Sequence, residues 1–485
     1  MNSKNQFETD LDKWIEHEKS AIDLQHIVGK LWFERSIELV IFRNQLVDRS
    51  ASEILFLHNY AKDFVKKPIS VEDSLLLART IEQDSDVAPS RIDIGRLATE
   101  WLNEKASFGD PKLFINHKLK SFIGLDKRVL KPKNVVLYGF GRIGRIAARE
   151  IVAQAGKGEQ LRLRAIVTRG NSDEEIAKRA DLLRNDSVHG PFPGTVIEDF
   201  ERKALIINGH TVFMISANKP AEIDYTAYGI EDALVIDNTG ATRDRAGLSE
   251  HLKAKGVDKV LLTAPGKGDV PNVVYGVNQH NFETSTETIF SAASCTTNAI
   301  VPVLAVINKN LGVVSGHIET IHSYTNDQNL LDNYHKKYRR GRSAALNMVI
   351  TETGAGSAVA KVLPELVGKL TANSVRVPTP NVSLAILHLK LNTPAGKEEV
   401  NNLLRHAALH GELVEQIQFS MSNELVSSDL VGNPCASIVD SQATISSYDH
   451  QNVVLYVWYD NEYGYTRQVV RYAKYLSDVI RLTYY

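Results

Sequence analysis

The chain has 485 residues, 43% hydrophobic and 24% charged, a composition typical of globular proteins. Lys and Arg total 56 against 58 Asp and Glu, and this net charge of -2 gives no electrostatic reason to expect a nucleic-acid partner. The sequence has neither an apolar run of the roughly 18 residues that a membrane span needs nor a signal-peptide pattern, so we expect a cytoplasmic protein without a membrane partner.

The first 130 residues differ from the rest, because they contain only four of the 30 glycines. Capping-box patterns at Ser50–Glu53 and Ser90–Asp93 each precede apolar residues at helical spacing. We therefore predict an all-helical (all-α) N-terminal domain over residues 1–131.

The predicted helices carry four large aromatic residues: Trp14, Trp32, Phe33 and Trp101. Aromatic residues at helical spacing belong to a core more often than to a ligand surface, so we expect them to be buried. Nothing in this domain indicates chemistry. Covering the catalytic region, self-association and regulation all stay open as its role.

After Pro132 short apolar runs alternate with helical stretches. Four of these runs are predicted as buried strands: 135–138, 161–168, 233–237 and 260–264. Strands that alternate with helices indicate an α/β fold, here a Rossmann-type domain with a parallel sheet over residues 132–294.

Two later runs, 384–391 and 453–459, are longer and alternate in polarity. This pattern predicts an antiparallel sheet in an α+β catalytic domain over residues 295–461. A C-terminal helix within 462–485 is expected to complete the Rossmann domain.

The glycine-rich segment GFGRIG follows the first of the predicted strands and precedes a helical stretch, which is the order of the dinucleotide-binding fingerprint. Gly139 permits the tight turn, Gly141 lets the backbone approach a pyrophosphate, and Gly144 allows the helix to pack closely on the strand. Arg142 and Ile143 begin the helix whose free N–H groups would bind the phosphates. The alternative is a tight turn that binds no ligand.

An acidic residue ordinarily ends the second strand of such a domain and binds the adenosine ribose hydroxyls. Here the strand runs into Arg169 instead. Because a carboxylate would repel a 2'-phosphate and an arginine can bind one, NADP or dual use is favoured over strict NAD. The alternative is a solvated arginine that leaves NAD binding merely weaker.

Cys295 is expected at the start of a helix, since an apolar strand precedes it and a helical run follows. The helix dipole and free backbone donors there favour thiolate, so we predict a lowered pKa for this thiol. His322, 27 residues later, ends another apolar segment and could exchange protons with the sulfur. A lone cysteine is more often a small core residue, which is our interpretation of Cys435. No Cys/His cluster has zinc spacing, and no metal is expected.

Six motifs, in order, make the chain similar to the phosphorylating glyceraldehyde-3-phosphate dehydrogenases over about residues 133–480. They are GFGRIGR, DSVHG, ASCTTN, HSYTNDQ, RVPTPNVS and WYDNEYGY. The family as a whole lacks the 130-residue preface, so the chain resembles a long form with an N-terminal helical extension.

The resemblance implies reversible oxidation of glyceraldehyde 3-phosphate to 1,3-bisphosphoglycerate with NAD or NADP and inorganic phosphate. Cys295 would attack the aldehyde to form a thiohemiacetal and then a thioester, with His322 as base. Asn461 would hold the nicotinamide, and Tyr465 would lie close by. A homotetramer is implied as well.

The resemblance also implies two phosphate sites. The substrate phosphate would be bound by Thr325 and Arg376, and inorganic phosphate by Ser294, Thr296, Thr353, Gly354 and one arginine of the cluster 339–342, taken as Arg342. Asp327 stands where many relatives have a threonine, and it is tolerable there if it pairs with an arginine or points away.

Two alternatives stay open. Erythrose-4-phosphate dehydrogenase shares the Cys/His pair but hydrolyses the thioester, and the phosphate-site residues Thr325, Thr353 and Gly354 argue against it. A non-catalytic scaffold or sensor that retains the fold is disfavoured by the intact catalytic set.

Overall fold

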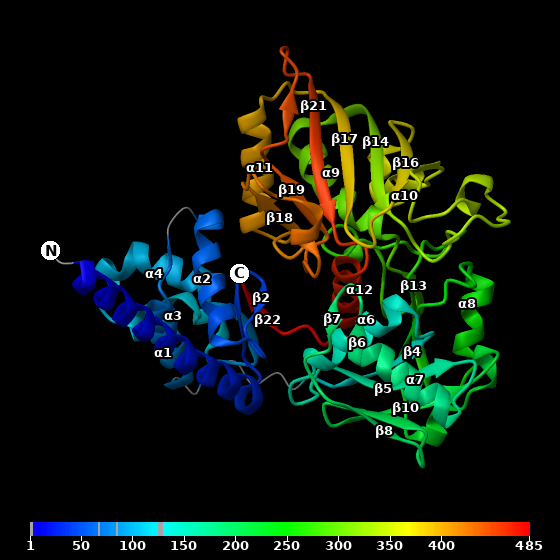
Figure 1. Cartoon of the computed structure of the whole chain (residues 1–485), viewed down its shortest axis with the longest axis horizontal. Coiled ribbons are helices and arrows are strands. Elements are labelled where there is room, and N and C mark those ends of the chain that lie inside the picture. Colours follow the sequence, from blue (N-terminus) through cyan, green and yellow to red (C-terminus); the bar gives the residue numbers. More distant parts are fainter. Residues whose placement is uncertain (1–2, 66–67, 84–85, 125–129) are drawn as a thin grey trace. The chain divides into compact units, whose positions relative to one another are not determined.

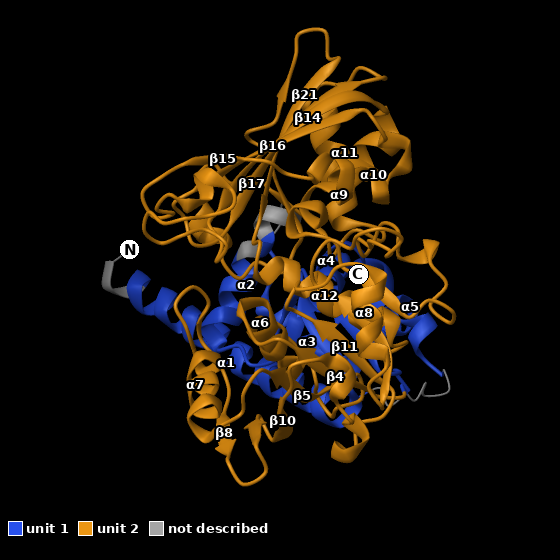
Figure 2. Cartoon of the chain, turned by 90° about the vertical axis from the view of Figure 1, so that its right-hand side faces the viewer, with its two compact units in different colours: residues 1–130, 480–485 blue, residues 131–479 orange. Residues whose placement is uncertain are grey.

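The structure is a computed structural model, and it describes residues 3–65, 68–83, 86–124 and 130–485. The chain divides into two compact units, which Figure 2 colours separately. Unit 1 comprises residues 1–130 and 480–485, and unit 2 comprises residues 131–479.

Five α-helices are described in unit 1: α1 (Ser3–Arg35), α2 (Ala51–Val65), α3 (Val71–Gln83), α4 (Ile94–Phe108) and α5 (Pro111–Lys118). The predicted capping box before α2 is confirmed. The backbone N–H of Ser50 donates to the Glu53 carboxylate (2.8 Å), and the N–H of Glu53 donates to Ser50 Oγ (3.3 Å). Two orphan donors at the helix start are thereby satisfied.

The prediction that the four aromatic residues are buried is half right. Trp32 and Trp101 lie in the core, whereas Trp14 and Phe33 are exposed. Both exposed residues belong to α1, and they lie off the face through which this helix packs on its neighbours.

Unit 1 is not all-helical, which corrects the prediction. Four short strands form a sheet in the order β2-β1-β3-β22. Their bounds are Glu38–Ile41 for β1, Asn44–Gln45 for β2, Ser90–Asp93 for β3 and Leu482–Tyr484 for β22. Strands of two to four residues are too short to show a period, which is why the sequence pattern missed them.

The segment Ser90–Asp93, predicted as a capping box, is the strand β3. The helix after it is capped by Asp93 alone, whose side chain accepts a hydrogen bond from the backbone N–H of Arg96 (3.0 Å). The predicted helix therefore forms with a different cap.

The C-terminus of the chain also differs from the prediction. Within 462–485 only α12 (Tyr463–Leu476) is helical, and β22 joins the sheet of unit 1 by pairing parallel to β3. This pairing joins segments almost 400 residues apart in sequence, so no local pattern could indicate it.

Unit 2 begins with the predicted parallel sheet, which is confirmed (Figure 1). Its strand order is β13-β12-β11-β4-β5-β10-β9-β8. The six parallel strands are β4 (Lys133–Tyr138), β5 (Leu161–Thr168), β10 (His210–Ser216), β11 (Ala233–Asp237), β12 (Val257–Leu262) and β13 (Ile289–Ser291). The edge strands β8 (Val196–Asp199) and β9 (Ala204–Ile207) run antiparallel. The strand order reverses at β4, the switch point at which such sheets bind dinucleotides.

Three helices accompany this sheet: α6 (Arg142–Ala153), α7 (Asp173–Arg184) and α8 (Arg245–Leu252). The helix α12 shares a hydrophobic core with α6, to which it contributes Tyr465, Val469 and Tyr472. The end of the chain thereby supports the first Rossmann helix.

The second sheet of unit 2 is largely antiparallel, in the order β15-β16-β14-β17-β21-β19-β18. Its site-bearing and central strands are β14 (Val313–Ser323), β15 (Val349–Thr351), β16 (Leu370–Val377), β17 (Ser383–Leu391) and β21 (Asn452–Tyr459). The outer strands are β18 (Ile417–Ser420) and β19 (Ser437–Asp440). The predicted antiparallel pair is confirmed, because β17 pairs with β21.

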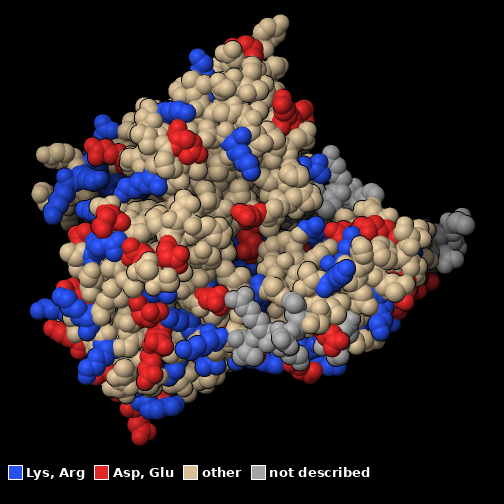
Figure 3. All heavy atoms as spheres, turned by 180° about the vertical axis from the view of Figure 1, so that it is seen from behind, with Lys and Arg blue, Asp and Glu red and all other residues tan. Residues whose placement is uncertain are grey.

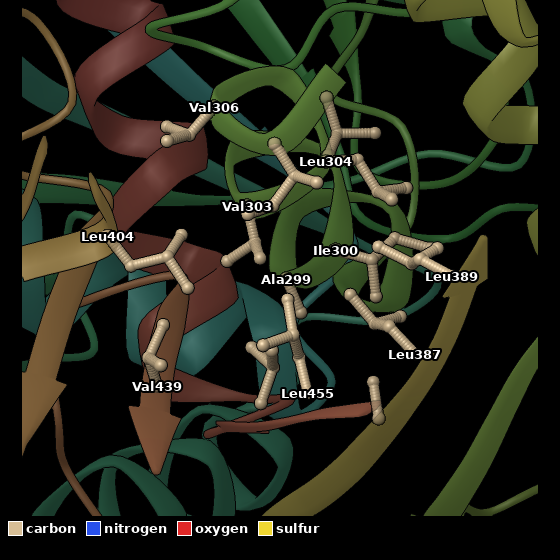
Figure 4. Close-up of a cluster of buried hydrophobic side chains, with 14 of the residues drawn as sticks. Ala299, Ile300, Val303, Leu304, Val306, Leu387, Leu389, Leu404, Val439 and Leu455 are labelled. Atoms are coloured by element: carbon tan, nitrogen blue, oxygen red, sulfur yellow. The ribbon is translucent and has the colours of Figure 1, made fainter. Parts of the chain in front are cut away.

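The helix α9 (Cys295–Leu311) packs its apolar face against this sheet (Figure 4). Ala299, Ile300 and Leu304 of α9 are fully buried with Leu387 and Leu455 of the strands. This burial fixes the axis of α9 and so the position of its first residue, Cys295.

Charged side chains of both signs are interspersed over the face shown in Figure 3, in keeping with the near-neutral net charge. Among the described residues, no helix combines the length and apolar character that crossing a membrane requires.

Candidate active site

Cys295 is the first residue of α9, directly after a strand-to-helix turn, as predicted. Ala293 in this turn has a φ of 56°, a left-handed conformation that residues with a Cβ rarely adopt. Ser294 caps the helix with its Oγ. Asn298, which the sequence analysis did not single out, donates from Nδ2 to the carbonyls of Ala292 (2.8 Å) and Ser294 (2.9 Å). The turn thus holds the thiol at the helix N-terminus.

The sulfur of Cys295 lies 3.6 Å from Nε2 of His322. His322 is the next-to-last residue of β14, and its Nδ1 lies 2.7 Å from the carbonyl oxygen of Ser323. A carbonyl can only accept, so Nδ1 carries the proton and donates to it. The lone pair of Nε2 therefore faces the thiol, and this is the tautomer that a general base needs.

Both members of the pair are neutral in this environment, which corrects the predicted lowering of the cysteine pKa. Cys295 keeps partial exposure, but burial of the thiol raises its pKa and outweighs the Arg376 charge and the hydrogen bonds at the helix start. Burial, together with the same Arg376 charge, lowers the pKa of His322 to about 3. The site therefore holds a thiol beside a neutral imidazole that can accept its proton.

Arg376 lies opposite His322 in the register between β16 and β14. Its Nη1 donates to the carbonyl of Ser323 (2.9 Å) and to Oγ1 of Thr325 (3.2 Å). Its Nε is buried and has no hydrogen-bond partner within the described part of the chain. A buried donor of this kind next to a threonine hydroxyl suits an anion.

Asp327 pairs with Arg340 and also accepts a hydrogen bond from Thr325. Although burial opposes it, the Thr325 hydrogen bond and the Arg340 charge lower the pKa of Asp327. Arg340 donates further to Oγ1 of Thr351 from Nε (3.1 Å) and Nη2 (2.9 Å). The carboxylate is therefore neutralised, which is the condition on which the sequence analysis tolerated it.

A cavity of about 610 Å³ opens beside these residues. Its lining includes Arg339, Arg340, Thr351 and Thr353. Gly354 follows as the residue that caps α10 (Ala355–Val362). The cavity thus combines arginines, hydroxyl groups and a helix start.

Arg342 lies apart from this cavity, contrary to the assignment by resemblance. Its Nε donates to Asp332 (2.8 Å), and its side chain is 65% exposed. Arg340 takes the place near the threonines instead. The two arginines are only two residues apart, so sequence alone could not separate them.

Tyr459 connects several of these groups, although the sequence analysis gave it no role. Its hydroxyl bonds with the hydroxyls of Thr296 (3.0 Å) and Thr320 (2.8 Å), and its ring meets that of His322 edge-on. The hydroxyl of Thr296 is therefore already engaged. The only signal in the sequence was that Tyr459 belongs to the motif WYDNEYGY.

Asn461 and Tyr465 lie on the segment that leads into α12. The side-chain oxygen of Asn461 accepts a hydrogen bond from Ser383 (2.9 Å), which fixes the orientation of the amide. The hydroxyl of Tyr465 donates to the carbonyl of Ala293 (2.9 Å), in the turn before Cys295. Tyr465 therefore braces the nucleophile turn rather than lining an open site.

The glycine turn has the geometry that its sequence predicts. Gly139 has a φ of 93°, and a Cβ on Gly144 would come within 2.4 Å of the Gly139 carbonyl oxygen. A Cβ on Gly141 would meet nothing within 4 Å, so open space lies above the backbone at the start of α6. The side chain of Ile143 packs against the core, whereas the backbone at the helix start fits a pyrophosphate.

The side chain of Arg142 is used within the protein. It bonds with Asp186 (3.0 and 3.1 Å) and with Glu462 (2.6 Å between Nη2 and Oε2), and Nε2 of His189 lies 2.9 Å from the same Glu462 carboxylate. The hydrogen bond with Glu462 raises the pKa of Arg142. The guanidinium thus ties α6 to the segment before α12, which leaves only the backbone of Arg142 for a cofactor.

Arg169 follows β5 directly and is exposed, and its carbonyl accepts a hydrogen bond from Ser216 Oγ (3.0 Å) at the end of β10. The turn around Gly170 is also close to the carboxylate of Glu175. The guanidinium itself is therefore presented at the carboxyl edge of the sheet.

Two family models match the chain. The glyceraldehyde 3-phosphate dehydrogenase NAD-binding domain matches residues 133–245, and the C-terminal domain of the same family matches residues 294–461. Together they cover both sheets of unit 2.

Curated proteins extend this similarity. A "glyceraldehyde-3-phosphate dehydrogenase-like protein" of Pseudomonas aeruginosa is 47% identical over 93% of this chain and 98% of its own length. Coverage this high includes most of residues 1–130. The glyceraldehyde-3-phosphate dehydrogenases of Priestia megaterium and Zymomonas mobilis are 40% and 39% identical over 70% and 71% of this chain, and over 96% and 99% of their own lengths.

Proposed function

Because the chain belongs to the glyceraldehyde-3-phosphate dehydrogenase family, we propose that it oxidises glyceraldehyde 3-phosphate reversibly to 1,3-bisphosphoglycerate, with inorganic phosphate and a nicotinamide cofactor. The observation that carries this proposal is the 3.6 Å contact between Cys295 Sγ and the unprotonated Nε2 of His322. A thiol with a base at this distance can become a nucleophile when substrate arrives.

In the proposed reaction His322 accepts the Cys295 proton as the sulfur attacks the aldehyde carbon, which gives a thiohemiacetal. Loss of hydride from that carbon leaves a thioester on Cys295, and the acceptor of the hydride is the bound nicotinamide. An oxygen of inorganic phosphate then attacks the thioester carbon, the carbon–sulfur bond breaks, and the acyl phosphate leaves. The thiolate is reprotonated from His322, which restores the neutral pair.

We assign the substrate phosphate to Thr325 and Arg376, since the buried Nε of Arg376 has no partner within the described residues. We assign inorganic phosphate to the cavity that Arg340 and Thr353 line, close to the start of α10. Backbone N–H groups at the start of α9 would add to this anion site.

The cofactor assignment rests on two turns. The open space above Gly141 and the close packing of Gly144 fit a dinucleotide at the start of α6. The exposed Arg169 at the end of β5 favours NADP or dual use over strict NAD, because it offers positive charge where a 2'-phosphate would lie.

Self-association is proposed as well, and tetramers are what the family resemblance implies. Exposed apolar side chains of the loop after β14 support it: Leu330 (74%), Leu331 (73%), Tyr334 (87%), Tyr338 (93%), Leu346 (81%) and Met348 (75%). Exposed apolar clusters of this size mark interaction surfaces.

A steady-state assay with glyceraldehyde 3-phosphate tests the proposal, with phosphate present or absent and with NAD or NADP. Phosphate-dependent turnover that Cys295→Ala abolishes is expected. Phosphate-independent turnover with a preference for erythrose 4-phosphate would support the hydrolytic alternative, and no turnover with either cofactor would support a non-catalytic role.

A further inference from the structure

The first half of α1 stands free of the helices against which its second half packs. Ion pairs join α1 to α3 at Asp23 and Lys30, and His17 lies 2.5 Å from Glu72 at the start of α3. Residues 6–17 are all exposed, and Figure 2 shows the first turns of α1 projecting beyond the other helices of unit 1. Isolated helical turns are only marginally stable in water, so a projecting segment gains stability by packing on a partner.

This projecting segment carries apolar side chains. The exposed fractions are 69% for Phe7, 45% for Leu11, 50% for Trp14, 37% for Ile15 and 53% for Ile22. At 3.6 residues per turn, these spacings place all five on one stripe.

The stripe is separate from the face through which α1 is buried. That buried face consists of Ala21, Leu24, Val28, Leu31 and Trp32. The helix therefore has two apolar faces, one covered within unit 1 and one open to solvent. An open apolar stripe of large side chains is a surface for association.

We propose that a second copy of this chain covers the stripe, through antiparallel pairing of the two α1 helices about a twofold axis between Trp14 and Ile15. The spacing is symmetric about that point, because Phe7 precedes Trp14 by seven residues and Ile22 follows Ile15 by seven. Phe7 of each copy then faces Ile22 of the other, and the central Trp14 and Ile15 side chains pack together. A twofold contact requires just such a self-complementary surface.

Charges beside the stripe select the antiparallel direction. Glu8, Asp12 and Lys19 lie on the same flank of the stripe, and Asp10 lies on the opposite flank. Antiparallel pairing brings like flanks together, so Lys19 of one copy meets Glu8 and Asp12 of the other. Parallel pairing would set Asp10 level with these same two carboxylates, which is repulsive.

The same charges argue against a membrane as the occupant. Residues 6–22 contain five carboxylates and two lysines. Anionic lipid headgroups would repel such a segment, whereas amphipathic helices that bind membranes are rich in lysine and arginine.

Disulfide trapping in the full-length chain tests the proposal, in a Cys295→Ser background where the remaining Cys435 is buried. Under mild oxidation the double variant Phe7→Cys/Ile22→Cys should form covalent dimers, and each single variant should stay monomeric on a denaturing gel. The two positions lie about 22 Å apart along one helix, so a bond within a chain is impossible.

Two further changes in the double-cysteine chain provide the control. Leu11→Glu puts a charge in the stripe and should abolish cross-linking. Thr9→Glu adds the same charge two residues away, on nearly the opposite face, and should leave cross-linking intact.

Three outcomes would overturn the proposal. These are absence of cross-links in the double variant, equal cross-linking by the single variants, and binding to anionic lipid vesicles that Leu11→Glu prevents. Because the readout is cross-linking, failure here is distinguishable from failure of the proposed enzymatic activity.

Discussion

Arg376 and His322 lie opposite each other on neighbouring parallel strands, with Arg376 Nη1 3.0 Å from His322 Nδ1. The guanidinium charge disfavours protonation of the imidazole and favours ionisation of the Cys295 thiol. One arginine thus tunes both members of the catalytic pair, in addition to the anion site we assign to it.

The first prediction concerns this charge. Because positive charge stabilises thiolate, Arg376→Gln should raise the thiol pKa further, so the midpoint of the pH profile for alkylation of Cys295 should move upward by about one pH unit. Iodoacetamide labelling followed by mass spectrometry measures it. Arg339→Gln, in the same basic loop, should leave the midpoint unchanged; an equal shift in both variants would contradict a local effect.

The two cysteines should differ sharply in reactivity. Cys295 is partly exposed, whereas Cys435 is 1% exposed in an apolar cluster. Alkylation should therefore label Cys295 first, and loss of activity should follow that label in time. Cys295→Ala should abolish turnover with little change in melting temperature. Equal labelling rates at the two cysteines would count against the site as described.

Two glycine variants separate packing from cofactor binding. Gly144→Ala should destabilise the ligand-free protein by about 1–3 kcal/mol, since its Cβ would clash with the Gly139 carbonyl. Gly141→Ala meets open space at an ordinary φ of -77°, so it should leave the melting temperature unchanged but weaken cofactor binding. Thermal denaturation and a fluorescence titration with NAD(P)H measure the two effects. If Gly141→Ala bound cofactor normally, the phosphate site would have to lie elsewhere.

Cofactor preference should depend on Arg169. Arg169→Asp should lower the ratio of NADP to NAD efficiency about tenfold or more, because a carboxylate repels a 2'-phosphate and accepts from ribose hydroxyls. Values of kcat/KM with each cofactor measure this ratio. Lys178→Asp makes the same charge change on the exposed side of α7 and should not alter it. The NADP assignment fails if the two variants behave alike.

The last six residues should stabilise unit 1 rather than the catalytic unit. Deleting residues 480–485 removes β22, the Tyr484–Glu100 hydrogen bond (2.6 Å) and the contact of Arg481 over Trp32 (4.7 Å). We expect faster hydrogen exchange and proteolysis within residues 1–130 and unchanged turnover per active site. Loss of turnover in proportion to proteolysis would show that the two units unfold together.

A milder variant of the same contact gives a pH test. Although burial opposes it, hydrogen bonds from Tyr484, Arg96 and Lys118 lower the pKa of Glu100. A lowered folded-state pKa stabilises the protein above the unfolded value of about 4.3, and this stabilisation is lost as pH falls through the folded pKa. Tyr484→Phe should therefore cost about 1 kcal/mol at neutral pH, and less in acid, in the free energy of unfolding.

Local features of the sequence were sufficient wherever neighbouring residues decide the outcome. GFGRIG between a strand and a helix predicted the phosphate-binding turn, and the strand before Cys295 predicted its place at a helix start. Repeated apolar runs predicted both sheets. Each of these inferences depends on spacing within about ten residues, where backbone sterics and hydrogen bonding act directly.

Contacts between distant segments decided the rest. The pairing of β22 with β3, the choice of Arg340 over Arg342, and the Asp327–Arg340 ion pair all depend on which segments the fold brings together. The pKa of Cys295 depends on burial by the whole site, which the helix dipole alone could not reveal. The sequence by itself thus determined the family, the two sheets and the nucleophile, whereas the charge state and the partners of that nucleophile were decided only by tertiary structure, because desolvation and ion pairing depend on three-dimensional proximity.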